Sequence, residues 1–234
     1  MENYRIISVG ADAKTVKGEK RGTLTGILYL APADELAGVN NCPHASPGCR
    51  AACLFTAGMG AMGNVRSARM AKTARFYMDR DGFLADLRRD LTTLVSEAKK
   101  QKMVPACRLN GTSDLPWEKI APTLFTDFPT VVWYDYTKNP VRMRKFLAGK
   151  LPSNYSLTFS RSETNDRLSG NILREGGNVA VVFSGRQLPK RYKGVPVING
   201  DVDDRRFADK RGRWVGLLAK GKAKKDKSGF VITL

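Results

Sequence analysis

Residues 104–114 read VPACRLNGTSD, an apolar run that ends in small polar residues. Similar short apolar runs recur at residues 24–30, 130–133, 155–159, 178–183, 195–198 and 214–218. Several segments between them have a helical composition, among them residues 117–125, 141–147 and 164–174. Apolar runs that alternate with helices predict parallel strands joined by helical crossovers. We therefore expect about seven strand units.

Two helices are predicted between the apolar run at residues 24–30 and the stretch at residues 104–114. They span residues 65–78 and 83–100. In the second, Phe83, Leu87, Leu91 and Leu94 recur at steps of three and four residues. This spacing is typical of a helix with one buried face. Asp81, just before Gly82, is the expected N-cap of that helix.

The strand units predict the fold class. In parallel sheets and barrels the carboxyl ends of the strands share one face, where α/β folds build their sites. We predict an α/β fold, a partial (β/α) barrel with mostly parallel strands. A single domain is expected to span residues 1–234, with a peripheral N-terminal segment (1–22), a β/α core (23–218) and a basic C-terminal segment (219–234).

Residues 41–64, NCPHASPGCRAACLFTAGMGAMGN, follow the first predicted strand and form what we call the cysteine loop. The loop holds Cys42, Cys49 and Cys53 at spacing C-x6-C-x3-C, together with the only histidine, His44. Thiolates suit zinc or the irons of a cluster. Two metal sites are open: a [4Fe–4S] cluster with one iron left free, and a closed Cys3His zinc site that includes His44. A loop without metal, or with a disulfide, is the remaining alternative.

Polar side chains end the predicted strands. Asp114, Asp135 and Glu163 are candidates for acid–base catalysis, and Ser160 and Ser162 for cofactor binding. No Ser-His-Asp arrangement, P-loop or G-x-G-x-x-G after a strand is present, which disfavours conventional hydrolases and kinases. A metal-dependent nuclease that uses strand-end carboxylates is a weaker alternative.

The charge balance is strongly basic. Forty Lys and Arg against 22 Asp and Glu give a formal net charge of +18. Such a field attracts polyanions, of which nucleic acid is the first candidate, while the alternative is a basic protein with a solvated surface. The candidate nucleic-acid residues lie after the cysteine loop and toward the C-terminus: Arg66, Arg69, Arg186, Lys190, Arg191, Lys220, Lys222 and Lys224.

The sequence contains no apolar run of about 18 residues that could span a membrane. The N-terminal residues contain no apolar signal core behind a basic start. We therefore expect a cytoplasmic protein and no membrane partner. Nothing in the sequence indicates an oligomeric state.

The segments NCPHASPGCRAACLFTAG, RLNGTSD, YDYTK and SRSE together resemble an uncharacterised family of phage-encoded proteins, over roughly residues 24–230. More loosely, a three-cysteine loop after the first strand of a parallel β/α series is similar to the radical S-adenosylmethionine (SAM) superfamily. That resemblance implies a radical-SAM-like fold, a cluster on Cys42, Cys49 and Cys53, and SAM on the open iron. The superfamily's usual spacing is C-x3-C-x2-C, and Ala52 stands where an aromatic residue is common.

The same resemblance places residues 110–114 where the superfamily has a Gly-Gly-Glu segment that contacts the methionine amine. It thereby implies SAM contacts for Asn110, Gly111, Ser113 and Asp114. The expected function is an iron–sulfur, radical-SAM-like phage protein that acts on or with nucleic acid in the host-cell cytoplasm. The alternative from another class is a non-catalytic nucleic-acid-binding protein with a structural zinc or iron–sulfur site.

Overall fold

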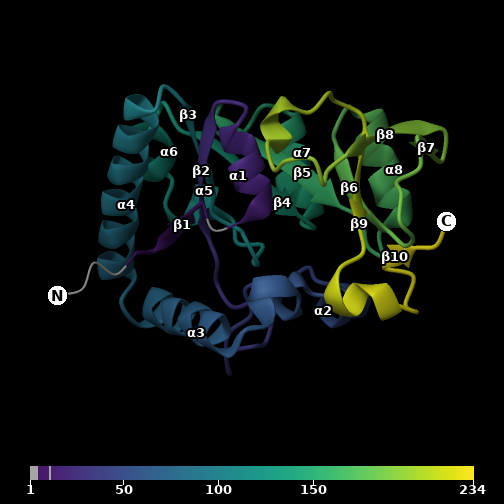
Figure 1. Ribbon diagram of the computed structural model, residues 1–234, viewed down its shortest axis with the longest axis horizontal. Coiled ribbons are helices and arrows are strands. Elements are labelled where there is room, and N and C mark those ends of the chain that lie inside the picture. Colours follow the sequence, from purple (N-terminus) through teal and green to yellow (C-terminus); the bar gives the residue numbers. More distant parts are fainter. Residues whose placement is uncertain (1–4, 11) are drawn as a thin grey trace.

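The structure, a computed structural model, describes residues 5–10 and 12–234. Its strands form one mostly parallel sheet, in the order β1-β2-β3-β4-β5-β6-β9-β8-β7, with β10 also paired to β6 (Figure 1). The strands are β1 (Ile7–Val9), β2 (Thr23–Leu28), β3 (Val104–Arg108), β4 (Val132–Thr137), β5 (Tyr155–Ser160), β6 (Val179–Phe183), β7 (Arg191–Tyr192), β8 (Val195–Asn199), β9 (Trp214–Leu218) and β10 (Val231–Ile232). The α-helices are α1 (Ala13–Glu19), α2 (Pro47–Ala51), α3 (Gly63–Met78), α4 (Arg80–Lys100), α5 (Trp117–Ile120), α6 (Thr123–Asp127), α7 (Pro140–Leu147) and α8 (Asp166–Arg174). Short 3-10 helices are η1 (Leu54–Thr56), η2 (Gly58–Ala61), η3 (Arg206–Ala208) and η4 (Gly221–Lys225).

The strands from β2 to β6 are neighbours in the sheet in the order in which they occur in the chain, and all pair in parallel. Right-handed crossovers in such an order place the connecting helices on one face. Helices α4, α7 and α8 pack there on the strands that they connect. The predicted α/β fold with mostly parallel strands is confirmed. The sheet stays open, however, and does not close into a barrel.

Alternation along the strands separates the two faces of the sheet. Trp133 belongs to the core under the helices, whereas its neighbour Tyr134 donates a hydrogen bond to Asp204 at 3.0 Å on the other face. Arg108 pairs with the same carboxylate at 3.2 Å. The segment around η3 contacts β4 and β5, so this second face is also covered.

Both predicted upstream helices are present as α3 and α4. The cap of α4 differs from the prediction, because Asp79 accepts the hydrogen bond from the Gly82 amide at 3.0 Å while Asp81 lies inside the first turn. The helix predicted at residues 117–125 is divided into α5 and α6. Pro122 disfavours helical geometry at the residue before it, and Ala121 indeed lies outside the helical region, with φ −145° and ψ 66°.

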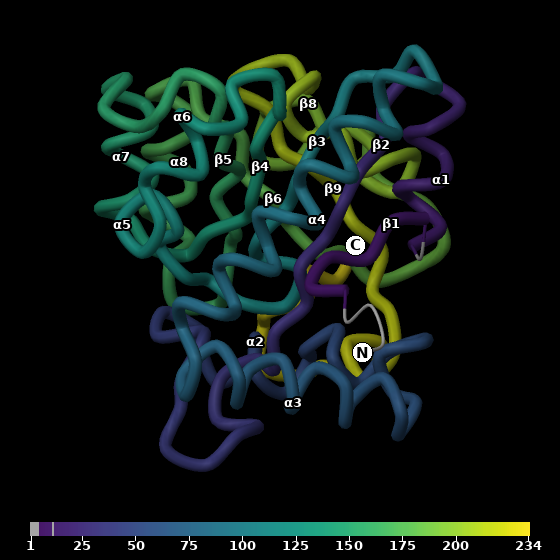
Figure 2. Tube along the Cα trace, turned by 90° about the vertical axis from the view of Figure 1, so that its left-hand side faces the viewer, coloured from purple at the N-terminus to yellow at the C-terminus, as the bar shows by residue number. Residues whose placement is uncertain are grey.

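The cysteine loop, α2 and α3 lie across the carboxyl edge of the sheet (Figures 1 and 2). The C-terminal segment folds back to the same edge, where η4 contacts η1 and β10 pairs in parallel with β6. At the other end of the chain, β1 pairs antiparallel with β2, and Ile6 and Ile7 are buried. No helix in the described part of the chain is both long and apolar enough to cross a membrane.

Candidate functional site

The cysteine loop is shaped by local capping. Ser46 is the N-cap of α2, and its Oγ accepts a hydrogen bond from the Cys49 amide at 3.2 Å. Pro47 occupies the first turn, where its missing N–H costs nothing. Glu163, just after the end of β5, holds this helix to the sheet, since its carboxylate accepts hydrogen bonds from Ser46 Oγ and from the Gly48 amide, both at 2.8 Å.

The three thiols of the loop interact with one another. Burial raises the pKa of Cys42 to about 12, and the charges of Cys53 and Cys49 add to that shift. Burial likewise raises the pKa of Cys53, with a contribution from Cys49. All three thiols are free and keep some exposed surface, whereas Cys107 is buried in the core.

Among residues 5–10 and 12–234, no three His, Cys, Asp or Glu side chains are grouped closely enough to hold a metal ion. His44, which the zinc alternative requires, is exposed. The cysteines are therefore neighbours without forming the ligand set of a single ion.

Two cations border the thiols. Lys138 follows β4. Burial lowers its pKa, but the charge and hydrogen bond of Cys49 and the charges of Asp114 and Cys42 outweigh burial, so its pKa is raised overall. Arg69 of α3 lies over the Tyr29 ring, 4.6 Å from its centroid. Burial lowers the pKa of Arg69, and the charges of Tyr29 and Cys53 oppose this shift. Within the described residues, neither cation has a carboxylate within ion-pair distance.

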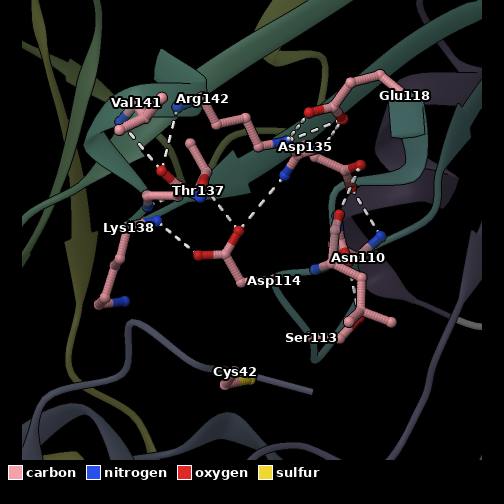
Figure 3. A network of polar contacts seen from close by, with 12 residues as sticks. Cys42, Asn110, Ser113, Asp114, Glu118, Asp135, Thr137, Lys138, Val141 and Arg142 are labelled. Atoms are coloured by element: carbon pink, nitrogen blue, oxygen red, sulfur yellow. Dashed lines mark hydrogen bonds and ion pairs between the residues drawn. The ribbon is translucent and has the colours of Figure 1, made fainter. Parts of the chain in front are cut away.

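Asp114 organises the turn after β4 (Figure 3). Its carboxylate accepts hydrogen bonds from Thr137 Oγ1 at 2.7 Å and from the Lys138 amide at 2.8 Å. Arg142 of α7 lies 3.4 Å away on the other side. The Asp114 amide in turn donates to the carbonyl of Asn41, at 2.8 Å. A residue predicted to be catalytic thus connects the β4 turn to the cysteine loop.

Asp135 lies in a buried polar network beside this turn. It accepts hydrogen bonds from the Asn110 amide at 2.7 Å and from Tyr155 Oη at 2.7 Å, while Arg142 bonds to the same tyrosine. Burial raises the pKa of Asp135 to about 6, although Arg142 and these hydrogen bonds oppose the shift. Arg142 also pairs with Glu118, at 3.0 Å.

The predicted cofactor-binding residues mostly bind one another. Asn110 Oδ1 accepts hydrogen bonds from Ser113 Oγ at 2.8 Å and from the Leu115 amide at 2.9 Å. Gly111 lies so near Leu28 that a Cβ would come within 2.7 Å of the Leu28 carbonyl oxygen. These groups shape a turn and leave few hydrogen-bond donors or acceptors for a ligand.

The serines at and after the end of β5 are also used within the protein. The Ser160 carbonyl accepts from Asn165 at 3.1 Å, and Ser162 Oγ lies 3.2 Å from Thr164 Oγ1. Nor are the acidic residues after β8 free: Asp201 pairs with Lys14 at 2.9 Å and Asp203 with Arg21 at 3.0 Å.

The predicted nucleic-acid residues do not form one surface. Arg66 pairs with Glu35 at 3.1 Å, and Arg69 lies over the rings of Tyr29 and Phe55, 4.6 and 5.6 Å from their centroids. Three of them, Arg186, Lys190 and Arg191, are exposed on or before the β7–β8 hairpin, apart from η4 in Figure 1. Lys220 pairs with Asp201 at 3.1 Å, and Lys222 and Lys224 are exposed on η4.

Sequence reasoning missed Lys138, Ser46 and Arg142. A lysine after a strand has no distinguishing pattern, and its approach to a cysteine 89 positions earlier in the chain depends on the fold. Ser46 carried the clearest signal, because a serine before proline is typical of a helix start.

A protein-family model described as Gene product 88 matches residues 5–234, a range that includes the sheet, the cysteine loop and the C-terminal segment. No curated protein and no solved structure matches the chain.

Proposed function

We propose that this chain, which belongs to the gene product 88 family, is an iron–sulfur protein whose cluster is held by Cys42, Cys49 and Cys53. The membership confirms the predicted resemblance to a phage-encoded family. One observation carries the proposal: three partly buried thiols of one loop act on one another by their charges and also on Lys138 and Arg69, neither of which has a carboxylate at ion-pair distance in the described structure. Three thiolates in a partly buried site repel one another, and nearby cations offset that cost.

Zinc and a cluster differ in how close they bring their thiolate ligands. Tetrahedral zinc with Zn–S bonds of about 2.3 Å brings its sulfur ligands to about 3.8 Å from one another. A cluster places each thiolate on a different iron, so that its ligands stand farther apart. The exposed His44 supports the second arrangement, because the closed zinc site needs this side chain as its fourth ligand.

A radical-SAM-like enzyme is the catalytic form of this proposal. Three cysteine ligands leave one iron of a [4Fe–4S] cluster without a protein ligand, and a bound cluster would supply one electron to SAM. The consecutive parallel order of β2 to β6, within an open sheet, supports it. Because Asn110, Ser113 and Asp114 are engaged with protein groups, cluster binding is better supported than SAM binding.

Nucleic acid is the proposed partner. The net charge of +18 and the exposed lysines of η4, which packs beside the cysteine loop, support it. The polyanion would then lie next to the cluster.

The test is metal analysis of protein purified without oxygen and reconstituted with iron and sulfide. We expect a brown protein with about four irons per chain. The Cys49→Ala variant should lose most of the iron and the visible absorption, whereas Cys107→Ala, which changes a core thiol, should retain both. A colourless, iron-free wild-type protein would overturn the proposal, and one tightly bound zinc per chain would establish the zinc alternative.

A further inference from the structure

The second half of the cysteine loop exposes a group of large apolar side chains. Leu54, Met59 and Met62, which we call the apolar trio, keep 56%, 61% and 52% of their surface exposed. They lie in and just after η1 and η2, two turns that pack against each other. Other large apolar side chains that are as exposed, such as Val141, stand alone in the sequence. Single exposed apolar residues are ordinary, whereas a local group of them marks an interaction surface.

The backbone that carries the apolar trio is fixed. Phe55, which follows Leu54, is fully buried and anchors η1. The Ala57 amide donates to the Leu54 carbonyl at 3.0 Å, and the Met62 amide donates to the Met59 carbonyl at 3.1 Å. A partner therefore meets apolar side chains whose backbone is already ordered, which lowers the entropy that binding costs.

Lysines border the apolar trio. The turn η4 packs against η1, and its first residue, Gly221, lies so near the loop that a Cβ there would come within 2.6 Å of the Ala57 Cβ. Lys222, Lys224 and Lys225 are exposed on η4 and form no ion pair among the described residues. Unpaired cations beside exposed apolar side chains fit a partner that offers anionic and apolar groups close together. Nucleic acid does so, with its phosphates and its base faces.

We propose that this surface binds nucleic acid by two contacts, the lysines of η4 on phosphates and the apolar trio against unstacked bases. This inference rests on the proposed nucleic-acid partner. Leucine and methionine are among the apolar wedges that proteins insert between base steps. Unstacking costs free energy, so the surface should prefer a nucleic acid in which bases are already unpaired. An anionic lipid surface fits less well, because interfacial binding uses an amphipathic helix, and η1 and η2 are single turns.

The experiment measures binding of the full chain to fluorescent DNA and RNA duplexes, each intact and with a central unpaired bulge. Anisotropy is recorded over a series of salt concentrations. The test variant replaces the apolar trio by serine, as Leu54→Ser, Met59→Ser and Met62→Ser. The matched control replaces three exposed apolar residues at the opposite end of α3, on α7 and after β8, as Met78→Ser, Val141→Ser and Val202→Ser. Exposed positions such as these change stability little, which thermal unfolding verifies.

We expect wild type to bind a bulged duplex about tenfold more tightly than the intact one. The test variant should lose this preference and lose about tenfold in affinity for the bulged duplex, because its apolar contacts are gone. Its slope of log K against log salt should equal that of wild type, since no phosphate contact changes. The control should match wild type in affinity, preference and slope.

The two failures are distinguishable. A wild-type protein that binds none of the duplexes contradicts the proposed nucleic-acid partner. If wild type binds and the test variant keeps its affinity and preference, the base contact is overturned. A shallower salt slope in the test variant also overturns it, because the lost contacts would then be with phosphates.

Vesicles containing phosphatidylserine and sedimentation velocity test the other occupants of this surface. If the test variant loses vesicle binding or self-association that wild type shows, but keeps its nucleic-acid binding, the apolar trio serves a lipid surface or a second copy of the chain. Either result overturns the base contact.

Discussion

Glu163 shows how a side chain predicted for catalysis can serve the architecture of a site instead. Its two oxygens accept from Ser46 Oγ and the Gly48 amide, both groups at the start of α2. A negative charge there is favourable, because the first N–H groups of a helix lack intrahelical partners. Glu163 thereby fixes the helix that carries Cys49 to the end of β5.

Asp135 gives a pH-dependent prediction. Burial raises its pKa to about 6 in the folded chain, against about 3.9 in an unfolded one. The folded state therefore favours the protonated form, and the stability that this contributes is complete below about pH 4 and is lost as the pH rises through 6. Relative to Asp135→Asn, which cannot titrate, we expect the free energy of unfolding of wild type to fall by about 2–3 kcal/mol between pH 4 and pH 7.

Urea unfolding of both proteins at a series of pH values measures this difference. Asp209, whose pKa burial also raises to about 6, is present in both chains, so its effect cancels in the comparison. If wild type instead gains stability over the variant as the pH rises, Arg142 keeps Asp135 ionised in the folded state and the prediction is wrong.

At the residue scale, the sequence predicts which side chains gather and predicts their roles less well. The cysteines and strand-end polar residues do meet at one edge of the sheet, because parallel strands bring their carboxyl ends together. Whether Asp114 faces a ligand or a neighbouring amide depends on turn geometry that composition does not encode. The same holds for Lys138, whose charge interacts with that of Cys49, a residue distant in the chain.

At the scale of elements, the C-terminal segment differs most from its expected form. The sequence predicts a basic stretch outside the core, but Phe230 and Val231 anchor it beside Ala52 and Ala223. Arg161 donates to the carbonyls of Gly229 and Phe230 at 2.6 and 3.0 Å. Only two residues of β10 pair with β6, so local sequence held little signal for this strand.

Phe230 is the main apolar anchor of that segment and belongs to the cluster against which Cys49 packs. Phe230→Ala should lower the free energy of unfolding by about 3 kcal/mol, the lower end for a buried phenylalanine, because this cluster is small. It should also speed tryptic cleavage at the lysines of η4. Unfolding and limited proteolysis check this, with Leu234→Ala, an exposed residue, as the control. If Phe230→Ala is as stable and as protease-resistant as Leu234→Ala, the segment is not anchored through this ring.

At the scale of the whole molecule, the predicted alternation of strands and helices holds because each apolar run is long enough for one strand and the connecting helices bury one face against the sheet. Closure of the sheet could not be predicted, since it depends on how the last strands are ordered. Here β9 lies between β6 and β8, and the β7–β8 hairpin ends the sheet with an antiparallel pair. The last connections are short and basic, and they return along the sheet without an α-helix.

The excess positive charge is spread over several faces, so the decisive question is whether the lysines beside the cysteine loop act together. Lys222, Lys224 and Lys225 are exposed on η4. If they neutralise phosphates, replacing all three by alanine should weaken binding to DNA or RNA. The slope of log K against log salt should then become shallower by about 1 for each phosphate that is no longer neutralised. Fluorescence anisotropy with a labelled oligonucleotide, in duplex and single-stranded form, measures both quantities.

The matched control replaces Arg144, Lys145 and Lys150 by alanine, which removes the same charge from exposed positions on and after α7. A general electrostatic attraction would weaken equally in both triple variants, because each lowers the net charge by three. A binding surface at η4 would make the first variant lose affinity and slope while the control stays near wild type. Equal losses would therefore contradict a nucleic-acid site beside the cysteine loop, even if the protein binds nucleic acid, since a solvated basic surface would then account for the binding.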